Sequence, residues 1–386
     1  GWDEHFGAGR LNADRAVRAV VPLTGVSLTG PESGYILAKQ TFTAVAGPIT
    51  ATRVYTWQAT GHPPVVRAGE LTDTIAFSWD TPGPKMVTVI AANFATVVSA
   101  THVVDVVVPP AGATLTVCQS GGCGYRDIQT AVDAASTDNV IQVAAGTYTG
   151  TNDYGGLSQV VYVDRDVTLR GGYGTDFAES PDPEVHPTIV DAQGAGRVFY
   201  VTGAISPTIE GFHVTGGDAA GLGGGLGGGD VGGGVYVIDA NATVSGCHIV
   251  SNTARYGGGV YLWDSDGKIV GNTVTGNTAD WGAGIYLDSE SAATVVDNHV
   301  VGNRADNDGG GIYLYNSPAT LRGNHVSDNE AVALAGGLYL WESDAALDGN
   351  WFTGNVTGSD GGGVYVARCD AVFTNTLVAD NEAAGA

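Results

Sequence analysis

The sequence predicts an all-β protein whose larger part is a right-handed parallel β-helix solenoid. Three features support this: a repeat of about 25 residues, a glycine cluster in each repeat, and asparagines at two further positions of each repeat. The repeats are rich in Gly, Val, Thr and Tyr and contain no unbroken amphipathic run of helical length, which excludes a helical solenoid. Coils of this length with two or three short strands would stack about 4.8 Å apart.

The repeat is clearest between residues 232 and 386, where a glycine-rich unit ending in tyrosine recurs. The tyrosines are Tyr236, Tyr261, Tyr286, Tyr313, Tyr339 and Tyr365, at steps of 25, 25, 27, 26 and 26 residues. Two polar series keep the same period: Asn252, Asn277, Asn303, Asn329, Asn355, Asn381 and Cys247, Asn272, Asn298, Asn324, Asn350, Asn375. Because stacking places like residues over like, we expect Asn272, Asn298, Asn324, Asn350 and Asn375 to form a hydrogen-bonded ladder.

Apolar residues alternate with these asparagines and are expected to point into the core. The two inward series are Val244, Ile269, Val295, Leu321, Leu347, Val372 and Ile249, Val274, Val300, Val326, Phe352, Leu377. Glycines at the corners of the coils supply the positive φ angles that tight bends require.

The composition limits the classes of partner that the chain is expected to bind. The 386 residues carry a net charge of −24 with only 16 Lys and Arg, which opposes binding to nucleic acid or to an anionic membrane. No apolar run reaches transmembrane length, so we expect no membrane insertion. The chain begins with Gly1, without an initiator methionine or a signal peptide. We therefore expect an internal piece of a longer chain. The further expectations are that the parent protein is secreted or at the cell surface and that this piece is monomeric.

The four cysteines divide into two kinds. Cys118 and Cys123 bracket a glycine-rich loop, and a local disulfide in an oxidising compartment is the prediction. A metal site is the alternative, but it needs more ligands than this pair offers. Cys247 and Cys369 lie about five coils apart, beyond the reach of a disulfide, and are expected to be packing residues.

In chain order, residues 1–22 predict a short helix capped by Asn12. The run GAGRLNADRAV (Gly7–Val17) resembles the closing helix of subtilisin-like serine protease domains. The resemblance implies a parent protease whose catalytic Ser, His and Asp lie upstream of residue 1. An arbitrary alanine-rich helix is the alternative.

Residues 23–108 predict a small immunoglobulin-like β-sandwich, because β-branched and aromatic residues alternate between Gly/Pro turns. The expected strands are Gly25–Thr29, Thr41–Ala46, Val54–Ala59, Thr74–Trp79, Met86–Ala91 and Ser99–Val107. Trp57 and Trp79 are expected in the core. The run TPGPKMVTVIAAN (Thr81–Asn93) resembles the late strands of PKD-like modules on bacterial surface proteins, which implies a spacer or a weak binder. Residues 109–112 read as a linker.

Residues 113–386 form the predicted β-helix. Ile128, Ala131, Val132 and Ala135 share one face of an N-terminal capping helix with Asp127 as its cap, and Val140–Val143 follows as a strand. This stretch resembles the entry cap of right-handed β-helix proteins of the pectin-lyase-like class, and the resemblance extends to Ala386. It implies enzymes that cleave acidic polysaccharides, with calcium-binding aspartates and a base, or with paired aspartates. The sequence contains neither motif, so no catalytic residue is assigned.

Side chains just after the repeated tyrosines suggest a binding surface. Trp263, Tyr315 and Trp341 follow a tyrosine by two residues, and Asp264 and Glu342 follow one by three. Aromatic rings stack on sugar faces and carboxylates bond to hydroxyls, so a glycan-binding face is the functional interpretation. A solvated acidic edge of turns is the alternative.

Calcium is the cofactor that the sequence leaves open. The glycine loop between Gly216 and Gly234 distantly resembles calcium-binding glycine–aspartate nonapeptides, but its aspartates do not repeat at nine. The candidate ligands are Asp218, Asp230, Asp264 and Asp266. His299 and His325, one coil apart, are the nearest approach to a metal-binding histidine pair, with two solvated surface histidines as the alternative.

Two classes of function follow. The first is a non-catalytic extracellular stalk for adhesion or weak binding of an extracellular polysaccharide or other cell-surface component. The second is enzymatic: a polysaccharide lyase or hydrolase of the pectin-lyase-like class, or an accessory region of a subtilisin-like protease. The glycine turns, asparagines and tyrosines are explained by stacking alone, which favours the first class.

Overall fold

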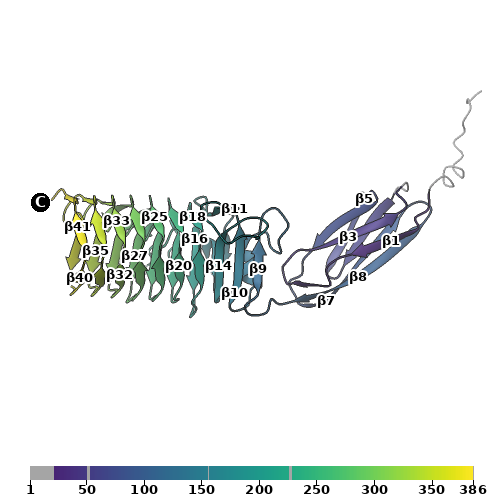
Figure 1. Ribbon diagram of the computed structural model, residues 1–386, viewed down its shortest axis with the longest axis horizontal. Coiled ribbons are helices and arrows are strands. Elements are labelled where there is room, and N and C mark those ends of the chain that lie inside the picture. Colours follow the sequence, from purple (N-terminus) through teal and green to yellow (C-terminus); the bar gives the residue numbers. More distant parts are fainter. Residues whose placement is uncertain (1–20, 50–52, 155, 226–227, 386) are drawn as a thin grey trace, which may run out of the picture. The chain divides into compact units, whose positions relative to one another are not determined.

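A computed structural model describes residues 21–49, 53–154, 156–225 and 228–385. They form two compact units that divide between Pro109 and Pro110, the first a β-sandwich and the second a right-handed parallel β-helix (Figure 1). The predicted all-β fold class is confirmed. Apart from residues 21 and 22, the helix and protease-like tail expected for residues 1–22 lie outside the described residues.

The sandwich consists of a three-stranded sheet, in the order β1-β3-β6, and a five-stranded sheet, in the order β2-β8-β7-β4-β5. The strands are β1 (Gly25–Thr29), β2 (Ser33–Tyr35), β3 (Gln40–Gly47), β4 (Arg53–Ala59), β5 (His62–Gly69), β6 (Thr72–Phe77), β7 (Gly83–Ala92) and β8 (Val97–Val107). Alternate residues of these strands face inward, as the alternation in the sequence predicts.

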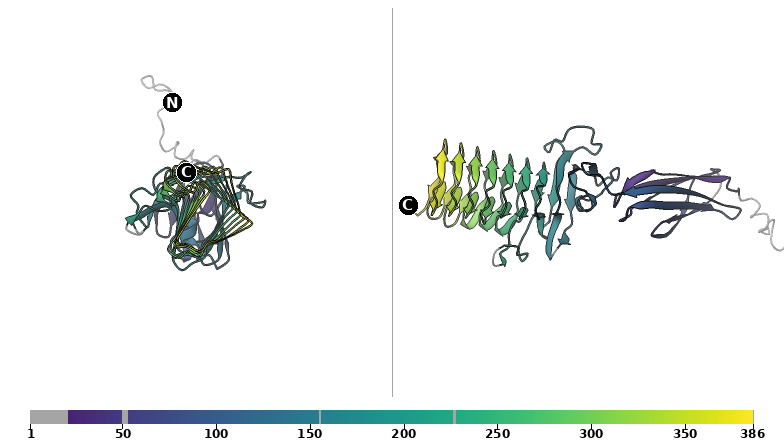
Figure 2. Two further views of the ribbon diagram at one scale, coloured as in Figure 1. Left: turned by 90° about the vertical axis from the view of Figure 1, so that its left-hand side faces the viewer. Right: turned by 90° about the horizontal axis from the view of Figure 1, so that it is seen from below.

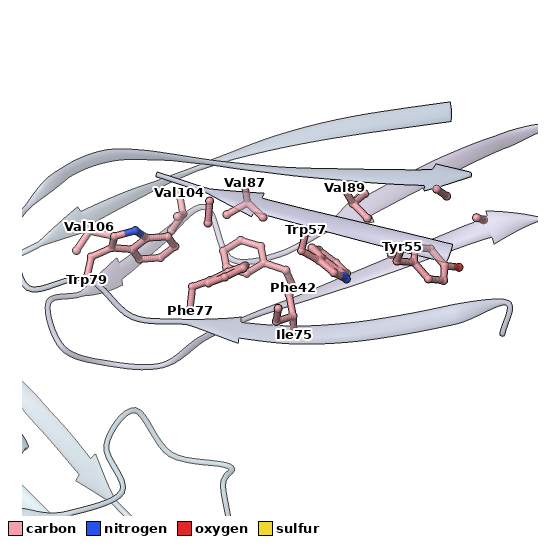
Figure 3. Packing of buried hydrophobic residues seen from close by; sticks show 14 of the residues in the cluster. Phe42, Tyr55, Trp57, Ile75, Phe77, Trp79, Val87, Val89, Val104 and Val106 are labelled. Atoms are coloured by element: carbon pink, nitrogen blue, oxygen red, sulfur yellow. The ribbon is translucent and has the colours of Figure 1, made fainter. Parts of the chain in front are cut away.

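The core between the two sheets contains the predicted tryptophans (Figure 3). Trp57 is fully buried and its indole N–H donates to Asp73 Oδ2 at 2.7 Å. Trp79 is also buried, and its indole N–H donates to the Thr60 carbonyl at 2.7 Å. Both rings therefore bury their apolar surface while their polar atoms stay hydrogen-bonded.

Four parallel ladders of strands form the β-helix, and successive coils lie over one another (Figure 2). Sheet A contains β9 (Thr114–Val117), β10 (Asn139–Ala144), β14 (Val167–Tyr173), β17 (Thr208–Glu210), β20 (Thr243–Ser245), β24 (Lys268–Val270), β28 (Thr294–Val296), β32 (Thr320–Arg322), β36 (Ala346–Asp348) and β40 (Val372–Thr374). Sheet B contains β11 (Gly146–Thr149), β15 (Thr188–Asp191), β18 (His213–Thr215), β21 (His248–Val250), β25 (Thr273–Thr275), β29 (His299–Val301), β33 (His325–Ser327), β37 (Trp351–Thr353) and β41 (Leu377–Ala379).

The other two ladders carry the tyrosine repeat and the strands that precede its glycines. Sheet C contains β12 (Asn152–Tyr154), β13 (Leu157–Val163), β16 (Arg197–Thr202), β19 (Val235–Ile238), β23 (Val260–Trp263), β27 (Ile285–Asp288), β31 (Ile312–Tyr315), β35 (Leu338–Trp341) and β39 (Val364–Ala367). Sheet D contains β22 (Thr253–Tyr256), β26 (Thr278–Trp281), β30 (Arg304–Asp308), β34 (Glu330–Ala331), β38 (Val356–Thr357) and β42 (Glu382–Ala383). Between the described strands of these four sheets, all pairings are parallel except the β12–β13 hairpin.

Helix α2 (Ile128–Ala134) covers the entry of the β-helix. The Asp127 side chain caps it by accepting the Thr130 N–H at 2.7 Å, and its apolar side chains are buried. The expected linker belongs in part to this unit, because the Pro110 carbonyl accepts the Asn139 side-chain amide at 2.7 Å and the Gly112 N–H donates to Thr137.

The glycine clusters have two separate causes. Gly257 has a φ of 65° and opens the turn before β23, a conformation that L-residues with a Cβ rarely adopt. At Gly259 the φ is ordinary, but an added Cβ would lie 2.6 Å from the Gly284 carbonyl of the next coil. The backbone of neighbouring coils therefore approaches too closely for any side chain at this corner.

The asparagine ladder spans four coils in the interior. Asn272, Asn298 and Asn324 each donate an amide proton to the next asparagine at 2.9–3.0 Å, ending at Asn350. All four side chains are almost fully buried. The parallel series from Asn252 to Asn381 makes the same coil-to-coil bonds.

Asn375 does not continue this ladder. It aligns with Gly349, has a φ of 47°, and its amide donates to Asp348 Oδ1 on the surface at 2.9 Å. Thr376 takes the ladder position of the last coil, so the predicted series was one residue out of register there.

The same shift corrects other assignments in the last coil. Phe373 and Val378 pair with the inward Leu347 and Phe352, in place of the predicted Val372 and Leu377. Cys247 is buried as expected, whereas Cys369 is only half-buried. The structure joins Cys118 to Cys123 in a disulfide.

Candidate functional site

The outer face of sheet C carries a continuous column of tyrosines. Tyr162, Tyr200, Tyr236, Tyr261, Tyr286, Tyr313, Tyr339 and Tyr365 pair in register on neighbouring strands. Their neighbours along each strand point into the core, as Val260 and Leu262 do, so the tyrosines face outward. Five of the eight are nevertheless buried, which requires that other side chains cover them.

Two rows of side chains flank this column. On one side, Tyr256 and Trp281 end strands β22 and β26 and pair in register. On the other, the last residues of the sheet C strands form a second row. That row runs Ile238, Trp263, Asp288, Tyr315 and Trp341. The column from Tyr200 to Tyr365 and most of the apolar side chains of the flanking rows form one cluster outside the solenoid core.

Between the two rows lies a hollow of about 320 Å³, which we call the aromatic groove. It is lined by Gly225, Tyr256, Tyr261, Trp281, Tyr286, Asp288, Tyr313 and Tyr315. Six of these eight residues are aromatic, and one is a carboxylate.

Rings of the groove stack on one another within the tyrosine column and within the Tyr256–Trp281 row. Rings of the row meet rings of the column nearly at right angles. Tyr286 and Tyr313 have centroids 4.6 Å apart with planes at 8°, and Tyr256 and Trp281 are 4.9 Å apart at 14°. Tyr256 and Tyr286 meet at 85° with centroids 5.8 Å apart. Offset stacking leaves part of each ring face uncovered, and the perpendicular contact makes a corner of two aromatic surfaces.

Asp288 provides the charge of the aromatic groove. Its side chain is 8% exposed; Oδ2 accepts the Tyr261 hydroxyl at 2.6 Å and Oδ1 accepts the Ser289 hydroxyl at 3.2 Å. Burial raises the pKa of the Asp288 carboxyl, against the opposing effect of these hydrogen bonds. Burial, together with the neighbouring Asp288 charge, also raises the pKa of Tyr261.

A glycine-rich loop reaches the aromatic groove through Gly225, and a buried arginine holds it. The Arg197 side chain donates to the carbonyls of Val231, at 2.7 Å, and of Gly223. The Tyr236 hydroxyl donates to the Gly224 carbonyl at 2.8 Å. Glycines here let the backbone pass close over the tyrosine column, since a Cβ at Gly224 would lie 3.1 Å from both Arg197 and Tyr236.

The predicted glycan-binding aromatics share one row, but they are not equivalent. Tyr315 is 39% exposed and lines the aromatic groove, whereas Trp263 and Trp341 are half-buried and lie outside its lining. Asp288 separates Trp263 from Tyr315.

The predicted acidic residues Asp264 and Glu342 occupy turns and do not line the groove. Their φ angles are 46° and 50°, and every residue at this position of the repeat has a positive φ: Asp239, Asp264, Ser289, Asn316, Glu342 and Arg368. Asp and Asn are favoured in this conformation, which explains much of the acidic edge by backbone geometry.

Three of the four calcium candidates accept hydrogen bonds from backbone amides. Asp230 accepts the N–H groups of Gly221 and Gly223, Asp218 accepts that of Ala220, and Asp266 accepts that of Ala292. Asp264 and Asp266 line a second hollow of about 420 Å³. Among the described residues, no group of three or more His, Cys, Asp or Glu side chains is arranged to hold a metal ion.

The predicted histidine pair stacks on the outer face of sheet B. The rings of His299 and His325 are 5.1 Å apart at 15°, and His325 continues onto Trp351 at 4.7 Å. A second pair, His213 and His248, stacks at 4.6 Å. The pairs follow from the register of the strands.

Sequence reasoning missed Tyr256, Trp281 and Asp288. A signal for the first two was present: in two successive repeats an aromatic residue precedes the tyrosine by five positions. For Asp288 the signal was a single carboxylate at a position that holds an aromatic residue in three other repeats.

Comparison with known proteins supports the β-helix through one family model. The family described as "Right handed beta helix region" matches residues 228–357. A solved PKD domain of an M14-like peptidase from Thermoplasmatales archaeon SCGC AB-540-F20 is 19% identical, with a TM-score of 0.21, and the match covers 23% of this chain and 98% of that domain. No curated protein matches the chain. None of the described helices is long and apolar enough to cross a membrane.

The chemistry open to the aromatic groove follows from its lining. Ring faces bind apolar surface, and the tyrosine hydroxyls and the Asp288 carboxylate bind polar groups. Glycoside hydrolysis by two carboxylates needs a second acid or base. Asp288 is the only Asp or Glu among the described residues that line this groove.

Proposed function

We propose that this chain is a non-catalytic extracellular binding region of a larger secreted or surface protein, and that it binds a glycan in the aromatic groove. The observation that supports this most directly is the lining itself: aromatic rings at right angles around one buried carboxylate. Sugars offer both an apolar ring face and hydroxyl groups, and this lining complements both.

The expected affinity is weak. Of the aromatic residues that line the groove, Tyr256 and Trp281 are half-buried, Tyr315 is exposed and the other three are buried. At about 0.5–1.5 kcal/mol for each aromatic contact beyond burial, together with a few hydrogen bonds, the dissociation constant falls between about 0.1 and 10 mM. Binding at this strength suits adhesion through many copies or many sugar units.

A glycan array followed by calorimetry tests this proposal. Trp281→Ala and Tyr315→Ala should each weaken binding about fivefold to tenfold, the equivalent of about 1 kcal/mol. Trp351→Ala is the matched control, because this tryptophan is 49% exposed on sheet B, away from the groove. Equal binding by the parent and both groove variants would refute the proposed site.

The proposal that the chain is not a catalyst is tested separately, with activity assays. The chain should release no reducing ends or unsaturated products from pectin or alginate, and no peptides from casein. Cleavage of a polysaccharide would favour the alternative, a lyase or hydrolase, and Asp288→Asn would then show whether the groove contains the catalytic acid.

A further inference from the structure

The described lining of the aromatic groove carries one carboxylate, although the Arg255 guanidinium lies over the lining rings of Tyr256 and Trp281. The described residues that line it include no Lys, Arg or His. No ion pair among the described residues involves Asp288. Its oxygens accept from the Tyr261 and Ser289 hydroxyls and from the Ser289 backbone N–H, and none of these donors is charged. The carboxylate is therefore a buried negative charge without a cationic partner.

The aromatic surface around the groove already binds cations from the protein itself. The guanidinium carbons of three arginines lie over four of its rings, all within the range of cation–π attraction. The contacts are Arg197 over Tyr236 at 5.2 Å, Arg255 over Tyr256 at 5.3 Å and over Trp281 at 5.4 Å, and Arg368 over Trp341 at 4.6 Å. Between them, Tyr286 and Tyr313 flank Asp288 and carry no such arginine in the described structure.

The size of the groove limits the occupant to a single small group. Its volume of about 320 Å³ lies at the lower end of the range for small-molecule pockets. A trimethylammonium headgroup or one hexosamine unit is of suitable size. An acidic sugar would place its carboxylate against Asp288, and the net charge of −24 would add to that repulsion.

We propose that the aromatic groove binds a ligand through an alkylammonium group, which contacts the Asp288 carboxylate and the faces of the surrounding rings. This inference rests on the proposed ligand-binding role of the groove and narrows its ligand to a cationic one. The carboxylate and rings are already fixed by the fold, so little reorganisation opposes binding. The source of the ammonium group is an amino sugar polymer or a choline-type headgroup.

Two pairs of probe ligands test whether binding depends on the positive charge of the ligand or on its shape. Choline is compared with 3,3-dimethyl-1-butanol, its neutral isostere, and a chitosan hexamer at mildly acidic pH is compared with a chitin hexamer, whose amines are acetylated. Calorimetry at low salt should show each charged probe binding at least about tenfold more tightly than its neutral counterpart.

Three variants tie this preference to the groove. Asp288→Asn keeps the shape and should remove most of the preference for charge. Asp138→Asn removes one exposed carboxylate of the cap, at a φ of 62° that asparagine tolerates, and should change nothing. Tyr315→Leu alters an exposed side chain without disturbing the buried cluster and should weaken choline binding severalfold, even if Asp288→Asn proves unstable.

The outcomes distinguish this inference from the proposed function. Equal binding of charged and neutral probes overturns the inference and leaves glycan binding in place. Choline binding without chitosan binding supports the ammonium site and counts against a glycan ligand. Failure of all four probes, or choline binding that neither Asp288→Asn nor Tyr315→Leu reduces, overturns the inference.

Discussion

Replacing Asn324 by alanine tests whether the asparagine ladder holds neighbouring coils together. The Asn324 side chain is fully buried. Its amide nitrogen donates to the Val295 carbonyl at 2.8 Å and to Asn350 Oδ1 at 2.9 Å. Its amide oxygen accepts the backbone N–H of Asn298 at 3.1 Å and the Asn298 side-chain amide at 3.0 Å. One side chain thus links three coils.

The cost of the substitution follows from the groups that lose a partner. Asn350 Oδ1 keeps the backbone N–H of residue 324, and the Asn298 side-chain amide keeps two carbonyls, so neither is left unpaired. The backbone N–H of Asn298 loses its side-chain acceptor, and leaving a buried donor without a partner costs about 1–3 kcal/mol. The lost bond to Val295 adds about 1 kcal/mol, so we expect Asn324→Ala to destabilise by about 2–4 kcal/mol.

Equilibrium unfolding in urea, followed by far-UV circular dichroism, measures this difference. Asn316→Gly is the matched control: Asn316 belongs to the same coil but is exposed, with a φ of 46°, where glycine is at least as favourable. The control should stay within about 0.5 kcal/mol of the parent. An Asn324→Ala midpoint that coincides with the control would refute the stabilising role of the ladder.

Three further predictions concern titration and reactivity. Burial raises the pKa of Tyr148 and Tyr339 to about 12, above the ordinary value near 10 in the unfolded chain. The free energy of unfolding should therefore fall as pH rises from about 10 through 12, and urea midpoints measured across this range test the prediction. Burial raises the pKa of the Cys247 thiol to about 12, so a thiol reagent should modify Cys369 alone in the native protein and both thiols after denaturation. Because burial raises the pKa of Asp288, its ionised carboxylate lowers the free energy of unfolding at neutral pH, and this loss should shrink as pH falls toward that pKa. The Asp288→Asn variant should lack this pH dependence and should unfold at a higher urea concentration than the parent at neutral pH.

The repeat made most of the β-helix predictable, because stacking gives each position of a coil the same environment in the next. Asn272 and Asn298 were therefore assigned from spacing alone. The same reasoning failed at Asn375, since asparagine suits two positions of the coil: the buried ladder and the adjacent turn with positive φ. The two positions are only one residue apart in the sequence, and the type of residue does not distinguish them, because both accept asparagine.

The sandwich shows a different limit. Strand β5 begins His62–Pro63–Pro64, and consecutive prolines argue against a strand. The strand lies at the edge of the five-stranded sheet, beside β4 alone, so it needs no donors on its outer side. Short β2 was missed as well, because three residues carry too little alternation to identify.

The aromatic groove was only partly predictable. Tyr315 was assigned to binding from its place after the tyrosine repeat, but Trp281 reaches the groove from sheet D, which the sequence did not separate from the glycine turn. Asp264 and Glu342 were assigned from charge, whereas backbone geometry accounts for polar residues at their turns. Charge along a sequence does not show which carboxylates point into a hollow.

The aromatic groove lies where the repeat is broken. The other rungs of the row through Asp288 hold apolar or aromatic residues, with Trp263 before it and Tyr315 after it. The coil that begins at Tyr286 is also the longest, with 27 residues to the next tyrosine. Stacking favours like over like, and burying a carboxylate without a cationic partner opposes folding. An aromatic ring at position 288 would avoid this cost, so the carboxylate there supports the proposed ligand-binding role of the groove.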